Sequence, residues 1–290
     1  MAETNNTNPC PACSWTSEKQ RCCSYASSVK LFYGASQRGA WFVGADVVLK
    51  GRPADPPTYE VPNTEFLQAY TSISIPGIAK AWLDKNNRQF IMVDRVEGEN
   101  LQDAWATLSP EARIRIADQT AKFLEQLRAL QSSKMASLGD APLYSGWLFL
   151  QGTKTPHGPF TSDDEFWASL VRTLDILPEK ARVAFRKRLP PCAPYTFTHG
   201  DLTTVNIMVK DGNLAAIVDW EWAGYYPVWW EYTAAGIGLS KEDAEWKELL
   251  RGKMQGFEGG RAFWKDFYKL SRFPDLDDEG KEVLEGLMRE

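Results

Sequence analysis

The 290-residue sequence has no clustered positive charge, no long apolar segment and only two histidines. Its formal net charge is -5, which argues against a nucleic-acid binder, because affinity for a phosphate backbone depends on clustered lysine and arginine. No apolar run approaches the length of a bilayer-spanning helix, and the first residues have neither the basic nor the apolar region of a signal peptide. We therefore expect a cytoplasmic protein with no nucleic-acid, membrane or obligate protein partner.

Cysteine is also scarce outside the first segment, which holds four of the five cysteines, Cys10, Cys13, Cys22 and Cys23. We expect no disulfides between them, because a reducing compartment keeps thiols reduced. The first pair has the C-x2-C spacing of half a zinc site, but the adjacent second pair is poor geometry for a tetrahedral metal. We interpret residues 1–28 as a disordered arm with free thiols, and metal binding is the alternative.

The pattern of apolar residues changes at Val29. Three short apolar runs separated by glycines follow up to Lys50 and predict an antiparallel meander. Residues 59–70 then predict a short helix, and residues 75–84 and 88–98 predict further strands. This part of the chain is therefore expected to be rich in β-structure.

The remainder is mainly helical. Ser109 and Ser162 stand where helix N-caps are expected, each before a segment whose apolar residues recur at helical spacing. Residues 240–254 and 278–290 predict two more helices. The pattern predicts an α+β protein with a small β-rich N-terminal lobe, residues 29–96, and a larger helical C-terminal lobe, residues 97–290. A ligand is expected in the cleft between the two lobes.

One predicted hairpin interrupts the helical part of the sequence. Residues 211–213, Asp-Gly-Asn, separate two apolar runs, and both glycine and asparagine accept the positive φ of tight hairpin turns. Asn206 begins the first strand and Asp219 ends the second, so both are expected at the open end. With a regular two-residue loop, the period-two alternation of side chains places them on the same face.

Polar side chains at this open end predict a site for a metal and a phosphate. Asn206 and Asp219 would supply two oxygens for Mg²⁺, which completes its shell with water and substrate phosphates. Asp201 is placed to accept a hydrogen bond from a substrate hydroxyl and to align it for attack. The alternative is a surface hairpin with solvated acids, but Asp219 follows an apolar run, and a buried carboxylate is costly unless it is paired or binds metal.

Two further polar residues lie near the hairpin. His199 is interpreted as a structural brace of the loop, because no second histidine lies at ligand spacing. Glu221 would contact a substrate or the surroundings of the metal, or would be an ordinary surface acid.

The stretch "HGDLTTVN" followed by "DWE" resembles the catalytic and metal-binding signature of the aminoglycoside phosphotransferase and choline kinase superfamily, which has a bilobal protein-kinase-like fold. "FIMVDRVEGENL" is similar to the hinge between the lobes of that family, and "VVLK" to its nucleotide-binding lysine strand. The resemblance covers roughly residues 29–290.

The resemblance implies that Asp201 is the catalytic base and that Asn206 and Asp219 bind Mg²⁺. It also implies that Lys50 contacts the α- and β-phosphates of ATP.

The same resemblance places other nucleotide contacts in the N-terminal lobe. Glu60 would pair with the phosphate-binding lysine, with Glu65 as the competing residue. Backbone groups around Asp94 and Val96 would hold adenine, with Met92 behind the ring.

The implied function is ATP- and Mg²⁺-dependent transfer of the γ-phosphoryl group to a hydroxyl of a small molecule, such as an aminoglycoside-, choline- or sugar-like acceptor. A catalytically weak pseudokinase or ligand-binding protein is one alternative, because the loop over the phosphates has only Gly34 and Gly39. A protein kinase is disfavoured, because Gly200 stands where protein kinases carry arginine and Pro227 leaves little room for a peptide platform. The acceptor is not determined by the sequence, although acids in the C-terminal lobe favour a cationic one.

Overall fold

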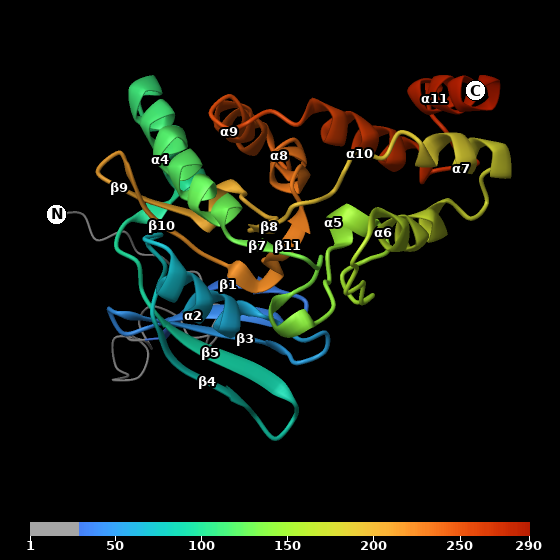
Figure 1. Cartoon of the computed structure of the whole chain (residues 1–290). Coiled ribbons are helices and arrows are strands. Elements are labelled where there is room, and N and C mark those ends of the chain that lie inside the picture. The colour runs from blue at the N-terminus through green and yellow to red at the C-terminus, as the bar shows by residue number, and fades with distance from the viewer. Residues whose placement is uncertain (1–28) are drawn as a thin grey trace.

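The computed structural model describes residues 29–290, so the interpretation of the cysteine-containing arm lies outside the described residues. The first part of the described chain is a five-stranded antiparallel sheet in the order β1-β2-β3-β5-β4 (Figure 1). Its strands are β1 (Val29–Ala35), β2 (Arg38–Val43), β3 (Val47–Pro53), β4 (Ile78–Leu83) and β5 (Arg88–Asp94). The predicted meander and both later strands are therefore confirmed.

Helix α2 (Glu60–Tyr70) connects β3 to β4 and turns a polar face inward. Its buried positions are Glu60, Asn63, Thr64 and Leu67. The Asn63 side-chain amide donates hydrogen bonds to the carbonyls of Trp220 and Ala223, at 2.8 and 2.9 Å. Because these carbonyls follow the hairpin, α2 connects the N-terminal sheet to the segment predicted to bind metal.

Most of the remaining chain is helical, as expected, and two of its helices begin at the predicted caps, Ser109 and Ser162. The Ser109 hydroxyl accepts the Ala112 N–H at the start of the longest of these helices, and Ser162 and Ser240 cap their own helices in the same way. The α-helices after β5 are α3 (Leu101–Ala104), α4 (Pro110–Ala129), α5 (Gly146–Phe149), α6 (Asp163–Leu170), α7 (Glu179–Arg186), α8 (Trp230–Ala234), α9 (Lys241–Arg251), α10 (Glu258–Leu270) and α11 (Asp278–Arg289). The short 3₁₀ turns are Leu138–Asp140, Val171–Leu174, Thr204–Asn206 and Trp220–Trp222.

Two three-stranded sheets lie among these helices, in the orders β10-β9-β6 and β11-β8-β7. Their strands are β6 (Glu99–Asn100), β7 (Gln131–Ser132), β8 (Tyr195–Thr198), β9 (Ile207–Lys210), β10 (Asn213–Ile217) and β11 (Gly224–Pro227). Figure 1 shows the five-stranded sheet at the bottom of the view and the helices α4 and α7–α11 above it. Across residues 29–290, no helix combines the length and apolar character that crossing a bilayer requires.

The predicted hairpin is formed by β9 and β10, but its predicted register is wrong beyond Leu214. Asp211 and Gly212 make the two-residue turn with φ of 51° and 68°. A bulge between Leu214 and Ala216 then shifts the pairing by one residue. Helix α4 holds the strand where the bulge begins, because Gln119 accepts the outward-facing Leu214 N–H at 2.8 Å.

The shifted register changes the reason why Asn206 and Asp219 share the open end. The Val218 N–H donates to the Asn206 carbonyl at 3.0 Å, so Val218 is the residue opposite Asn206. Simple alternation would then turn Asp219 to the other face. Asp219 instead leaves the strand in the left-handed conformation, with φ 67° and ψ 59°, and this turn redirects its side chain.

Candidate active site

The loop after β8 carries His199, Gly200 and Asp201, and a buried carboxylate holds its backbone. Glu231 of α8 accepts the N–H groups of His199 at 2.6 Å and Gly200 at 3.2 Å. Gly200 has φ 80°, a conformation that a side chain would make strained. The sharp turn therefore depends on a glycine and on an acceptor supplied from another element.

Both ring nitrogens of His199 are bonded within the protein. Nε2 lies 3.0 Å from the Val218 carbonyl and Nδ1 accepts the Asp201 N–H at 3.2 Å. Burial lowers the pKa of His199 to about 4, so the ring is neutral at physiological pH, with the proton on Nε2. These contacts join the loop to the end of the hairpin and support the interpretation of His199 as a brace.

Asp201 and Asn206 lie within hydrogen-bonding distance of each other. The Asn206 amide nitrogen donates to the Asp201 carbonyl at 2.9 Å and to its carboxylate at 3.2 Å. Burial raises the pKa of Asp201 to about 6, against the opposing charge of Lys247. Asp201 is thus mainly ionised at neutral pH and a better proton acceptor than an ordinary aspartate.

Lys50 brings two remote acids together. Its ammonium donates to Glu60 of α2 and to Asp219 Oδ1, the latter at 3.1 Å. Burial alone would lower the pKa of Lys50, but Asp219 and Glu60 raise it above its ordinary value. The partner of Lys50 is therefore Glu60, whereas the competing Glu65 is exposed.

The oxygens left at the hairpin end suit Mg²⁺. Among residues 29–290, nothing donates a hydrogen bond to Asn206 Oδ1 or Asp219 Oδ2. The same residues contain no cluster of three histidine, cysteine or acidic side chains suited to a metal. Two free oxygens match an ion that takes one or two protein ligands and completes its shell with phosphates and water, and they do not match a fully protein-ligated zinc site.

The predicted adenine-contacting residues lie at the end of β5 and just after it. Met92 is half-buried and pairs with Leu49 of β3. The Asp94 N–H donates to the Gly77 carbonyl at 2.9 Å. The N–H of Val96 has no partner among the described residues. The Val96 N–H is therefore one backbone donor left for a ligand here.

Glu221 has partners that the sequence analysis did not find. Its carboxylate accepts hydrogen bonds from Arg38 of β2, at 2.6 Å, and from Arg52 of β3. Both guanidinium groups lie within 6 Å of the Trp222 ring centre, at 5.8 and 5.9 Å. Arg52 stands two residues after Lys50 and is therefore on the same side of the strand. This spacing is a sequence signal that could have identified Arg52 as a residue of the site. No sequence signal identifies Arg38.

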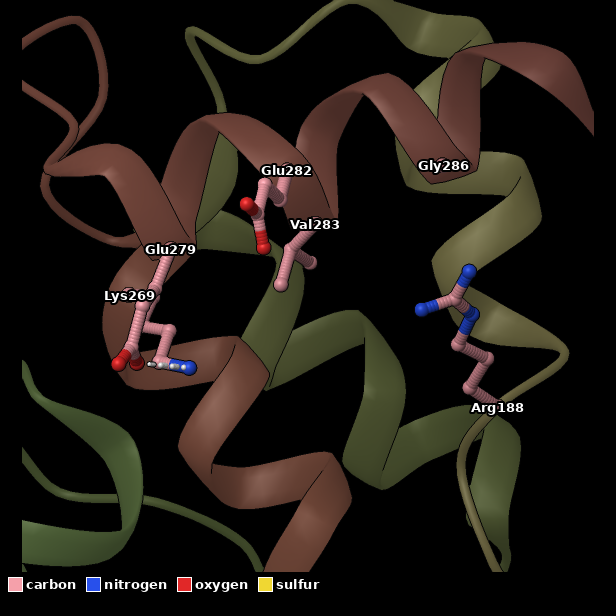
Figure 2. Close-up of a pocket in the computed structure, with 6 residues that line it drawn as sticks. All are labelled: Arg188, Lys269, Glu279, Glu282, Val283 and Gly286. Carbon is pink, nitrogen blue, oxygen red and sulfur yellow. Dashed lines mark ion pairs between the residues drawn. The ribbon is translucent and has the colours of Figure 1, made fainter.

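A small hollow opens beside Asp201, and it is lined by residues that the sequence analysis also missed. Trp147 of α5, Ile237 and Leu239 between α8 and α9, and Lys247 of α9 contribute to it. A wider and more open hollow lies where α7, α10 and α11 meet (Figure 2). Lys269 pairs there with Glu279 at 2.7 Å and Arg188 with Asp266 at 3.6 Å, whereas Glu282 has no partner among the described residues.

The fold is that of known kinases for small molecules. The ternary complex of streptomycin, ATP and APH(2")-IIa is 13% identical, with a TM-score of 0.56 over 94% of this chain and 95% of that one. The GDP complex of aminoglycoside 2'-phosphotransferase-IIIa is 18% identical, with a TM-score of 0.56 over 93% and 95%. A thermostable mutant of APH(4)-Ia in complex with AMP-PNP and hygromycin B is 15% identical, with a TM-score of 0.55 over 94% and 95%. These likenesses confirm the bilobal kinase-like fold.

Residues 34–267 match the model of the phosphotransferase enzyme family. The chain belongs to that family, which confirms the resemblance seen in its sequence motifs. A search of curated protein sequences finds no match to this chain.

Proposed function

We propose that this protein transfers the γ-phosphoryl group of ATP to a hydroxyl of a small molecule in a Mg²⁺-dependent reaction. The observation that carries the proposal is the meeting of Lys50, Asp219, Asn206 and Asp201, which come from β3, the end of the hairpin and the loop after β8. Family membership supports phosphotransfer. The nucleotides and antibiotics named for the structural relatives support ATP and a small hydroxylated acceptor.

In this proposal the N-terminal residues hold the nucleotide. Lys50 contacts the α- and β-phosphates, and Glu60 fixes the position of its ammonium group. The backbone at Asp94 and Val96 receives adenine, with Met92 behind the ring. The division into lobes at residues 29–96 and 97–290 and a cytoplasmic location stay predictions.

Asn206 and Asp219 would hold Mg²⁺ through their free oxygens. Bound there, the ion would neutralise charge on the phosphates and on the transferring group. Glu221, occupied by two arginines, is proposed to anchor the β1–β2 hairpin and not to bind the metal.

Asp201 is proposed to orient the acceptor hydroxyl. The hydroxyl oxygen bonds to the γ-phosphorus while the bond to the β–γ bridging oxygen breaks, so ADP leaves and the hydroxyl proton passes to the Asp201 carboxylate. His199 positions this carboxylate through the Asp201 N–H. The principal contribution of the protein is alignment of the two reactants.

The test measures nucleotide binding and turnover separately. The first assay is the thermal shift with ATP, with and without Mg²⁺, and the second is ATP consumption across a panel of hydroxylated metabolites and aminoglycosides. Asp201→Asn should abolish turnover and keep the Mg²⁺-dependent shift, whereas Asp219→Asn should lose that shift. The matched control is Asp211→Asn at the hairpin turn, where asparagine accepts the positive φ.

Turnover in Asp201→Asn equal to that of the wild type would disprove its assigned role. Mg²⁺-dependent binding of ATP without turnover on any acceptor would favour the pseudokinase alternative. Transfer to a generic protein substrate would favour a protein kinase.

A further inference from the structure

The hollow beside Asp201 has a mixed lining that bears on the acceptor. Asp201 stands on one side, and the apolar side chains of Trp147, Ile237 and Leu239 form much of the wall. Lys247 is the cation among the lining residues. A molecule with its hydroxyl at Asp201 would therefore place its neighbouring atoms against this wall.

The wall exposes large apolar side chains to solvent. Trp147 is 42% exposed and Leu239 is 60% exposed. A hydrogen bond from α10 fixes the short helix that carries Trp147, because the Trp147 carbonyl accepts the indole N–H of the buried Trp264 at 3.1 Å. The hollow itself holds only about 10 Å³, so the acceptor would lie against the exposed faces of these side chains at its mouth. Several exposed apolar residues beside one site are typical of a binding surface, whereas single exposed ones need no explanation.

The acids near Asp201 are already occupied. Asp219 pairs with Lys50 at 3.1 Å. Asp243 pairs with Lys247 at 3.0 Å and also accepts the N–H groups of Thr204 and Leu239, both at 3.0 Å.

The other two acids whose charges couple to Asp201 are Glu221 and Glu231. Glu221 is held by its two arginines, and Glu231 accepts the two backbone N–H groups of the catalytic loop. Of these four acids around Asp201, only Asp219 keeps an oxygen without a hydrogen-bond donor, and that oxygen is the one assigned to Mg²⁺. A bound amine would have to displace an internal partner, which leaves a buried charge or donor unsatisfied.

Lys247 lies on the same side, and Asp243 neutralises its charge. Its side chain is 6% exposed and its ammonium donates to the Ile237 carbonyl at 2.6 Å. A polyamine would therefore meet an apolar wall and an ion pair that is already closed, where it needs free carboxylates. The aminoglycosides named for the structural relatives carry several amino groups, so the fold likeness does not extend to this chemistry.

We propose that the acceptor is an uncharged alcohol with an apolar or aromatic face beside its reactive hydroxyl, and not a polycation. This inference depends on the proposed phosphotransfer at Asp201 and specifies the acceptor class for it.

The experiment compares two acceptor sets with the full-length protein and MgATP. One set contains neutral alcohols with an aromatic or alicyclic ring close to the hydroxyl, and the other contains kanamycin, gentamicin and choline. We expect ATP consumption to be stimulated by members of the first set, with kcat/KM at least tenfold above the second.

Variants then locate the contact. Leu239→Ser and Trp147→Ala should each raise KM for the neutral alcohol about tenfold and leave KM for ATP unchanged. The control Ile176→Ser, at a site that is 65% exposed and outside the hollow, should change neither KM value. Leu239→Asp should shift the ratio of kcat/KM values toward an amine-bearing acceptor, because it supplies an unpaired carboxylate.

The outcomes separate this inference from the proposed function. A protein that binds MgATP but phosphorylates only polycations, or no neutral alcohol at all, overturns the inference alone. Unchanged KM values in both wall variants also overturn it. Failure to bind MgATP overturns the proposed function, and the acceptor assignment with it.

Discussion

The buried ion pair between Asp243 and Lys247 offers the sharpest test of how the site is held together. The two side chains are 3% and 6% exposed, and their charged atoms lie 3.0 Å apart. Lys247→Met keeps the length of the side chain and removes its charge. The variant leaves the Asp243 carboxylate with two backbone donors, from Thr204 and Leu239, and leaves the Ile237 carbonyl without its donor.

The magnitude follows from the charge that is left behind. Removing one partner of a buried ion pair costs about 3–5 kcal/mol, because the remaining charge is buried without compensation. The two N–H donors still serve Asp243, so we expect the low end, about 3 kcal/mol. A protein of this size loses about 2–4 °C in Tm for each kcal/mol, so the variant should melt roughly 6–12 °C lower.

The assay is thermal and urea unfolding of the wild type, Lys247→Met, Asp243→Asn and the double variant. The double variant should recover at least half of the loss of Lys247→Met, because no charge then remains unpaired. If Lys247→Met melts within about 2 °C of the wild type, Asp243 does not need its partner. Asp243 would then be available to pair with an ammonium group of a ligand.

Three other changes test separate parts of the structure. Glu221→Gln should raise amide hydrogen exchange across β1 and β2 roughly tenfold, because Arg38 and Arg52 lose the charge that anchors them, and unchanged exchange would contradict the anchor. Burial lowers the pKa of His157 to about 4, so the unfolded state binds more protons below pH 6.5 and the free energy of unfolding falls as the pH drops from 6.5 to 4. In urea titrations at several pH values, His157→Phe should reduce this fall by up to about 3 kcal/mol. Gly98→Ala should cost at least about 2 kcal/mol in the same assay, because φ is 109° and an added Cβ would lie 2.1 Å from the Val209 carbonyl oxygen.

The parts of the fold that follow local rules could be predicted from the sequence. Ser109 and Ser162 cap helices where the pattern places them, and the helix predicted from residue 240 begins at Lys241. The Asp-Gly turn at residues 211–212 forms the expected hairpin. Each of these signals is contained within a few residues, so no knowledge of distant contacts is needed to recognise it.

The parts that depend on distant contacts could not be predicted in the same way. The bulge in β10 is supported by Gln119, 95 residues earlier in the chain. The hydrogen bond from Arg38 to Glu221 joins residues 183 positions apart, and no local sequence pattern at either residue predicts it. The prediction that Asn206 and Asp219 share a face depends on a regular register that the structure does not have.

The charge balance of the site explains why nucleotide binding should require the metal. Each positive side chain near the hairpin end is already matched by acids: Lys50 by Glu60 and Asp219, and the two arginines by Glu221. A nucleotide triphosphate adds several negative charges to surroundings that have no spare cation among these residues. The free oxygens of Asn206 and Asp219 make this deficit larger unless a divalent ion lies between them and the phosphates. ATP without Mg²⁺ should therefore bind at least tenfold more weakly than MgATP, and equal affinity in isothermal titration would show that the pairs around Lys50 open to receive the phosphates.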